Sequence, residues 1–197
     1  MTISTIDNSQ RTAAKIAGFS LLFSMVIVVF ANYVLLNPLI IPRNATETAR
    51  NIMAHETQFR VAVTCFLIYS ASVVVLLAAL YVILKPINQG LALVGALFRL
   101  VFAMLWLLST LNMLGALRLL GSTSYLQVFG ADRLQVLARL SVAATFDDYY
   151  VGLPFFGLAA TVCSYWFDSP MALFELVVSF WLLFKGLPRQ NADTAPP

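Results

Sequence analysis

Long apolar runs separated by short polar stretches dominate the pattern of this chain. Because an α-helix rises 1.5 Å per residue, about 20 apolar residues cross a bilayer core of about 30 Å. Each run in this chain is about that long or longer. The pattern therefore predicts an all-α integral membrane helical bundle of about five transmembrane helices, over residues 14–36, 59–84, 91–117, 149–167 and 170–187.

Polar residues mark the ends of these predicted helices. Asn37-Pro38 closes the first apolar run and Lys85-Pro86 closes the second. The stretch from Pro86 to Gly90 has the composition of a tight turn, so we expect the second and third helices to form an antiparallel hairpin. Residues 1–13 and 188–197 are polar and read as a loose N-terminal segment and a disordered tail around a single transmembrane domain, residues 14–187.

Two of the polar connections have an amphipathic pattern. Asn44 and Glu47 have the spacing of a capping box, which predicts a short helix over residues 45–55. Residues 132–146 place Leu134, Leu137 and Ala138 on one face and their charged neighbours on the other. Both segments are predicted to be interfacial helices that lie on the membrane.

Composition supports a membrane protein and excludes several other classes. Of the 197 residues, 60% are hydrophobic and 11% charged, and a soluble domain carries about 25% charged residues. The net charge of +3 is spread over the ends of the apolar runs without a basic cluster, so the bilayer is the expected partner and nucleic acid is not. A homo-oligomer is possible, and the distribution of Lys and Arg leaves the membrane orientation open.

Arg99 lies inside the third apolar run, about nine residues from its start, and so near the middle of the bilayer. A cation at that depth costs about 2.5 to 3.5 kcal/mol unless it is paired or hydrated. Glu175 in the fifth run reaches a similar depth if five spans hold, so Arg99 and Glu175 form a candidate intramembrane ion pair. Alternatively, Arg99 snorkels to the surface and Glu175 is simply hydrated.

A second polar group is expected at the opposite membrane face, formed by residues at the ends of three apolar runs. It could bind a lipid headgroup or supply an acid, a base and an anion holder, and it could equally be ordinary interfacial charge. Asn112 is expected to join helices rather than bind a ligand. The residues of this candidate polar face are His55, Glu56, Arg60, Arg118, Asp147 and Asp148.

With one His and no cysteine cluster or phosphate-binding glycine pattern, the sequence predicts no metal site, cofactor or catalytic residue. The leading interpretation is a binding, scaffold or small permeation component without recognisable catalytic chemistry. The alternative is an intramembrane lipid-modifying enzyme that uses the face around His55, Glu56, Asp147 and Asp148.

Several stretches resemble a bacterial family of uncharacterised multi-pass membrane proteins, domain of unknown function 4386. They are RTAAKIAGFSLLF, TARNIMAHETQFR, YVILKPINQGLALVGALFRL, GLPFFGLAATVCSYW and ELVVSFWLLFKG. The resemblance implies a multi-pass helical protein of the bacterial inner membrane and no assigned reaction. Members usually carry a further apolar helix before the last one, whereas here only FDSPMALF joins the last two runs, which would reverse the final span.

Overall fold

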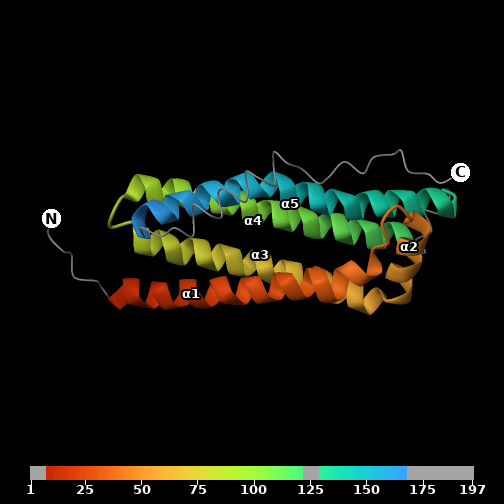
Figure 1. Cartoon of the computed structure of the whole chain (residues 1–197), viewed down its shortest axis with the longest axis horizontal. Coiled ribbons are helices and arrows are strands. Elements are labelled where there is room, and N and C mark those ends of the chain that lie inside the picture. The colour runs from red at the N-terminus through yellow and green to blue at the C-terminus, as the bar shows by residue number, and fades with distance from the viewer. Residues whose placement is uncertain (1–7, 122–128, 168–197) are drawn as a thin grey trace, which may run out of the picture.

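The computed structural model describes residues 8–121 and 129–167, which form five α-helices (Figure 1). Three apolar stretches are long enough to cross a membrane, Ser9–Leu39, Glu56–Leu84 and Gln89–Leu120. These stretches indicate a multi-pass membrane protein, but they do not establish the five predicted spans. The helices are α1 (Asn8–Val29), α2 (Ala45–Ala54), α3 (Glu56–Leu84), α4 (Gln89–Leu120) and α5 (Ala131–Phe167).

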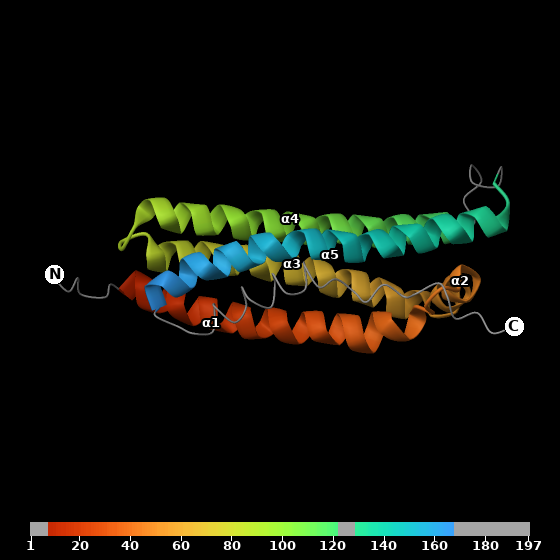
Figure 2. The ribbon, with the colours of Figure 1, turned by 45° about the horizontal axis from the view of Figure 1, so that its top comes forward.

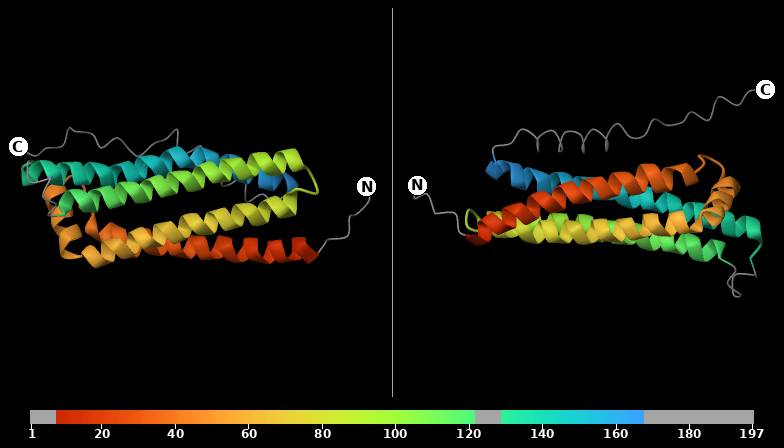
Figure 3. Two further views of the ribbon diagram at one scale, coloured as in Figure 1. Left: turned by 180° about the vertical axis from the view of Figure 1, so that it is seen from behind. Right: turned by 90° about the horizontal axis from the view of Figure 1, so that it is seen from below.

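The four long helices run side by side in alternating directions, and the short α2 crosses one end of the bundle (Figures 1 and 2). We call this end the α2 end, and the opposite end, where the chain turns from α3 into α4, the hairpin end. Packing contacts join α1 to α3, α3 to α4 and α4 to α5. The order in space is therefore α1–α3–α4–α5, with α1 and α5 as the outer helices, which Figure 3 shows from two further sides.

The predicted hairpin of the second and third apolar runs is confirmed. Helix α3 ends at Leu84 and α4 begins at Gln89, so the turn of residues 85–88 overlaps the predicted stretch and begins one residue earlier. Asn88 caps α4, because its side-chain oxygen accepts a hydrogen bond from Leu91 N at 3.0 Å. Pro86 cannot donate a backbone hydrogen bond and so favours the end of α3 at this point.

The first apolar run changes helix type before it ends, which the sequence did not predict. Helix α1 continues directly into a π-helix, η1 (Phe30–Leu36), and then into a short 3₁₀-helix, η2 (Asn37–Leu39). Gln58 Nε2 of α3 donates a hydrogen bond to the carbonyl oxygen of Leu35 at 2.8 Å. This bond satisfies one of the backbone acceptors that the end of the helix leaves without an intrahelical partner.

Helix α5 corrects the predicted division of residues 132–167 into an interfacial helix (132–146) and a separate span (149–167). It runs without a break for 37 residues. On the apolar face of the predicted interfacial helix, Ala138 is 1% exposed and Leu137 is 43% exposed. Part of the predicted apolar face therefore packs within the bundle, where α5 contacts both α4 and α2. A position of residues 132–146 at the membrane surface stays a prediction.

The last predicted span, residues 170–187, lies outside the described residues together with Glu175 and the polar tail. Within the described part, α5 is not among the stretches apolar enough to count as a candidate span. Its first half carries charges, and Asp147 and Asp148 interrupt the apolar residues on either side. The described residues thus contain three candidate spans, and the fifth predicted span lies outside them.

Candidate functional site

A cavity of about 490 Å³ lies inside the bundle, with walls from α1, η1, α3, α4 and α5. Phe102 and Trp106 of α4 line it, 13 and 17 residues after Gln89 and so about 20 to 26 Å along the helix axis. The cavity therefore lies near the middle of the candidate span. The cavity is partly open. The helices on its two sides, α1 and α5, do not form one of the packed helix pairs within the described residues.

Aromatic rings make most of the inner wall. Trp106 is its centre, with ring centroids 4.6 Å from Tyr69 and 5.2 Å from Phe66 of α3, and 5.9 Å from Tyr149 of α5. Rings at these separations hold one another in tilted or edge-on arrangements, so the wall is preformed. The polar groups of the lining come from Asn32, Tyr33, Asn37, Tyr69, Thr145, Tyr149 and Tyr150, and from Nε1 of Trp106, which is buried without a hydrogen-bond partner among the described residues.

Two departures from regular α-helical hydrogen bonding border the cavity. The π-helix η1 contributes Asn32, Tyr33 and Leu36, and π-helical turns occur frequently at functional sites. On the opposite side, Pro154 lies inside α5 and removes the backbone donor that would bond to the carbonyl of Tyr150, a lining residue. Both walls thus contain backbone whose hydrogen bonds depart from the α-helical pattern.

A polar cluster joins α4 and α5 beside the cavity. Asn112 Nδ2 donates a 2.7 Å hydrogen bond to Asp148 Oδ2, and Ser109 Oγ lies 3.3 Å from the same oxygen. Thr145 also lines the cavity. Its hydroxyl donates a 3.4 Å hydrogen bond to the backbone carbonyl of Ser109, and the Ser109 hydroxyl lies 3.3 Å from the backbone carbonyl of Thr145. The predicted role of Asn112 in joining helices is confirmed, and Asp148 lies half-buried in a helix seam rather than at an open rim.

Arg99 is only 7% exposed and faces the seam between α3, α4 and α5. Its guanidinium carbon lies 5.1 Å from the ring centroid of Phe156, a residue that lines the cavity. Buried Nε has no hydrogen-bond partner, and among the described residues no carboxylate forms an ion pair with Arg99. The cation–π contact therefore supplies part of the electrostatic stabilisation that hydration would give the guanidinium group in water.

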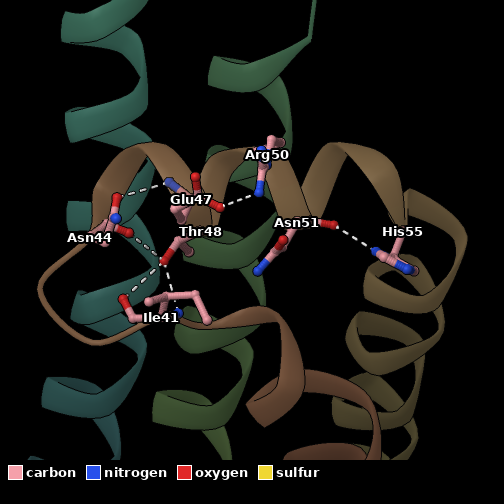
Figure 4. A network of polar contacts seen from close by, with 7 residues as sticks. All are labelled: Ile41, Asn44, Glu47, Thr48, Arg50, Asn51 and His55. Carbon is pink, nitrogen blue, oxygen red and sulfur yellow. Dashed lines mark hydrogen bonds and ion pairs between the residues drawn. The ribbon is translucent and has the colours of Figure 1, made fainter.

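The candidate polar face is not assembled into one hydrogen-bonded group. His55 is exposed at the junction of α2 and α3, and its Nδ1 is 3.2 Å from the carbonyl oxygen of Asn51 (Figure 4). Glu56 pairs with Arg60 one turn further along α3, at 2.5 Å. Arg118 and Asp147 are exposed. In the described part of the chain, no hydrogen bond or ion pair joins His55 to a carboxylate, and no group of three metal-ligating side chains occurs.

The same end of the bundle shows why α2 forms where the sequence predicted a capped helix. Asn44 Oδ1 accepts a hydrogen bond from Glu47 N at 3.0 Å (Figure 4). The Glu47 side chain bonds to Arg50 instead of returning to the cap. Thr48, 1% exposed, donates to Asn44 O and contacts both backbone groups of Ile41, so it ties α2 to the preceding loop. These interactions are structural.

Sequence reasoning missed the cavity, for which the only local signals were the paired aromatic residues Tyr149-Tyr150 and Phe155-Phe156. Because α5 is continuous from Ala131, these residues lie in its middle, and Tyr149, Tyr150 and Phe156 line the cavity.

Comparison with known proteins identifies the family. The sequence model of a family described as "Domain of unknown function (DUF4386)" matches residues 16–169, more than three quarters of the chain. The chain belongs to the DUF4386 family. No curated protein and no solved structure matches it. The DUF4386 match spans α1 to α5 and ends before the last predicted span, so it covers both sides of the cavity.

Proposed function

We propose that this DUF4386 protein binds a small, largely apolar molecule in the cavity between α1 and α5. The observation that supports the proposal is a space of about 490 Å³ at mid-bundle, with aromatic walls and a few polar groups. Ligand sites typically have volumes of 300 to 1,000 Å³ and this kind of lining. The partly open side between the outer helices would admit a ligand from the bilayer.

The proposal includes a membrane location, expected from the family resemblance to be the bacterial inner membrane. It also includes a crossing by α5, which packs along α4 from the hairpin end to the α2 end. Gly95 of α4 meets Val162 of α5 near the first end, and Asn112 meets Asp148 toward the second. A helix that follows a candidate span over this length would share its depth in the bilayer.

Binding is favoured over the alternative of a lipid-modifying enzyme. Such an enzyme would need His55 within about 3 to 4 Å of a carboxylate, directly or through a water, beside a cavity. His55 instead bonds to Asn51 O, Glu56 to Arg60 and Asp148 to Asn112. The cavity lining includes none of the four side chains that the enzyme would use, His55, Glu56, Asp147 and Asp148.

The test is a fluorescence titration of the purified full chain in nanodiscs with 1-aminoanthracene, with empty nanodiscs as background. Leu153 lines the cavity and is 7% exposed, so Leu153→Trp fills part of the space. We expect saturable binding that weakens at least about tenfold in this variant, because a filled cavity loses its contacts with the ligand. Leu158→Trp, at an exposed position of the same helix outside the cavity, is the matched control and should bind normally. Non-saturable partition, or equal loss in both variants, would contradict the proposal.

A further inference from the structure

The inner wall of the cavity carries hydrogen-bond donors that have no acceptor. Tyr69 of α3, Trp106 of α4 and Tyr149 of α5 line it, and the ring centroids of the two tyrosines lie 4.6 and 5.9 Å from the Trp106 ring. We call these three side chains the donor corner. Trp106 is 6% exposed, and its Nε1 is buried without a hydrogen-bond partner among the described residues. Because an indole N–H can only donate, this wall is short of acceptors.

The two tyrosine hydroxyls of the donor corner show the same shortage. Among the described residues, neither the Tyr69 hydroxyl nor the Tyr149 hydroxyl forms a hydrogen bond. Tyr69 is 8% exposed and Tyr149 is half-buried. The polar ends of buried tyrosine and tryptophan side chains usually find a partner, because a buried donor without an acceptor costs free energy. Three such donors at one wall indicate that the molecule in the cavity supplies the acceptor.

Arg99 decides between a neutral and a charged acceptor. Its guanidinium carbon lies 5.1 Å from the ring centroid of Phe156, which lines the cavity, so a positive charge lies close to the wall. This charge favours the negative end of a bond dipole in the cavity. Arg99 itself is not among the described lining residues. A carboxylate in the cavity would therefore be buried without direct contact with the cation, which is costly, whereas a neutral carbonyl group avoids that cost.

We propose that the ligand of the cavity is an apolar compound with a neutral carbonyl oxygen, and that the donor corner binds this oxygen. The inference rests on the proposed function, since it names the chemistry of the molecule bound in the same cavity. The hydroxyls of Tyr69 and Tyr149 donate to the oxygen, and the aromatic rings of the lining contact the apolar body of the ligand.

The test compares two probes that differ in one group. 9-Fluorenone carries a carbonyl where fluorene carries a methylene, and the two molecules are otherwise alike in shape. Each competes with 1-aminoanthracene for the purified full chain in nanodiscs, and partition into empty nanodiscs is subtracted. We expect 9-fluorenone to bind at least about tenfold more tightly than fluorene, because only its oxygen gives the unbonded donors an acceptor.

Three variants assign the preference to the donor corner. Tyr69→Phe and Tyr149→Phe remove the hydroxyls and keep the rings. Combined in one chain, they should reduce the preference for 9-fluorenone to about twofold or less and leave the affinity for fluorene unchanged. Tyr33→Phe is the matched control, since it makes the same change at a lining residue that is 70% exposed, and it should keep the full preference. Because each variant is measured with both probes, an altered cavity shape changes both affinities and cancels in their ratio.

The outcomes separate this inference from the proposed function. Saturable binding of both probes with equal affinity would leave the cavity as a binding site and overturn the carbonyl inference. A preference that survives in the double tyrosine variant would overturn it too, because the oxygen would then be bound elsewhere. The inference also falls alone if neither probe competes with 1-aminoanthracene that binds saturably. Non-saturable partition of 1-aminoanthracene itself would remove the proposed function and this inference with it.

Discussion

Asp148 is the residue at which the bundle holds a carboxylate between two long helices. The Asn112→Leu substitution keeps a side chain of similar size and removes the donor of the 2.7 Å hydrogen bond. We expect a loss of about 1 to 2 kcal/mol in the free energy of unfolding, because the half-buried carboxylate loses its best partner. The measurement is the thermal midpoint of the purified chain in detergent.

The neighbouring carboxylate provides the control for this prediction. Asp147 is exposed on the same turn of α5, so Asp147→Asn should change the free energy of unfolding by less than about 0.5 kcal/mol. If Asn112→Leu proves as mild as Asp147→Asn, the hydrogen bond contributes nothing measurable and the seam is held by apolar packing alone.

At the scale of elements, close approach of α4 and α5 depends on Gly152. A Cβ atom added there would lie 2.9 Å from Cδ2 of Phe102, whose ring is 3% exposed and packed against Phe156. Gly152→Ala should therefore destabilise the bundle by about 1 to 3 kcal/mol, since the ring has to shift. Gly115→Ala on α4 meets nothing within 4 Å and should be neutral or stabilising by up to about 1 kcal/mol. Chemical denaturation of both variants checks the contrast, and equal effects would refute the packing argument.

The elements also show what the sequence could and could not predict. The turn from Lys85 to Asn88 and the cap at Asn44 were predictable, because proline, glycine and asparagine act on the backbone locally. The division of α5 was wrong, because an amphipathic pattern records one apolar face without recording whether lipid or another helix covers it. The π-helix η1 has no sequence signature of this kind. It depends on contacts such as the one from Gln58 to Leu35.

For the whole molecule, the apolar runs predicted the fold class, whereas the cavity arises only from packing. Tyr69, Trp106 and Tyr149 come from three helices and more than 30 residues separate each from the next along the chain, so no local pattern links them. The polar face was predicted from residues expected at one membrane surface. The positions of residues at helix ends did not reveal that the Asp148 side chain lies between α4 and α5, where it bonds to Asn112.

The number of crossings is the property of the whole molecule that decides how these parts face the two sides of a membrane. Single cysteines at Ser9, Asn88, Thr46, Arg133 and Ser169, in a background with Cys65→Ala and Cys163→Ala, can be labelled with an impermeant maleimide in sealed vesicles. Ser9 and Asn88 belong to the hairpin end, and Thr46 and Arg133 to the α2 end, so the two pairs should label from opposite sides.

The side from which a cysteine at position 169 is labelled decides whether α5 crosses the membrane. It follows α5 by two residues, and α5 packs along α4 as far as the contact of Val162 with Gly95 near the hairpin end. A cysteine there should label from the side of Ser9, since four crossings return the chain to its starting face. Labelling from the side of Arg133 would show that α5 does not cross. The cavity would then have a wall that does not span the bilayer.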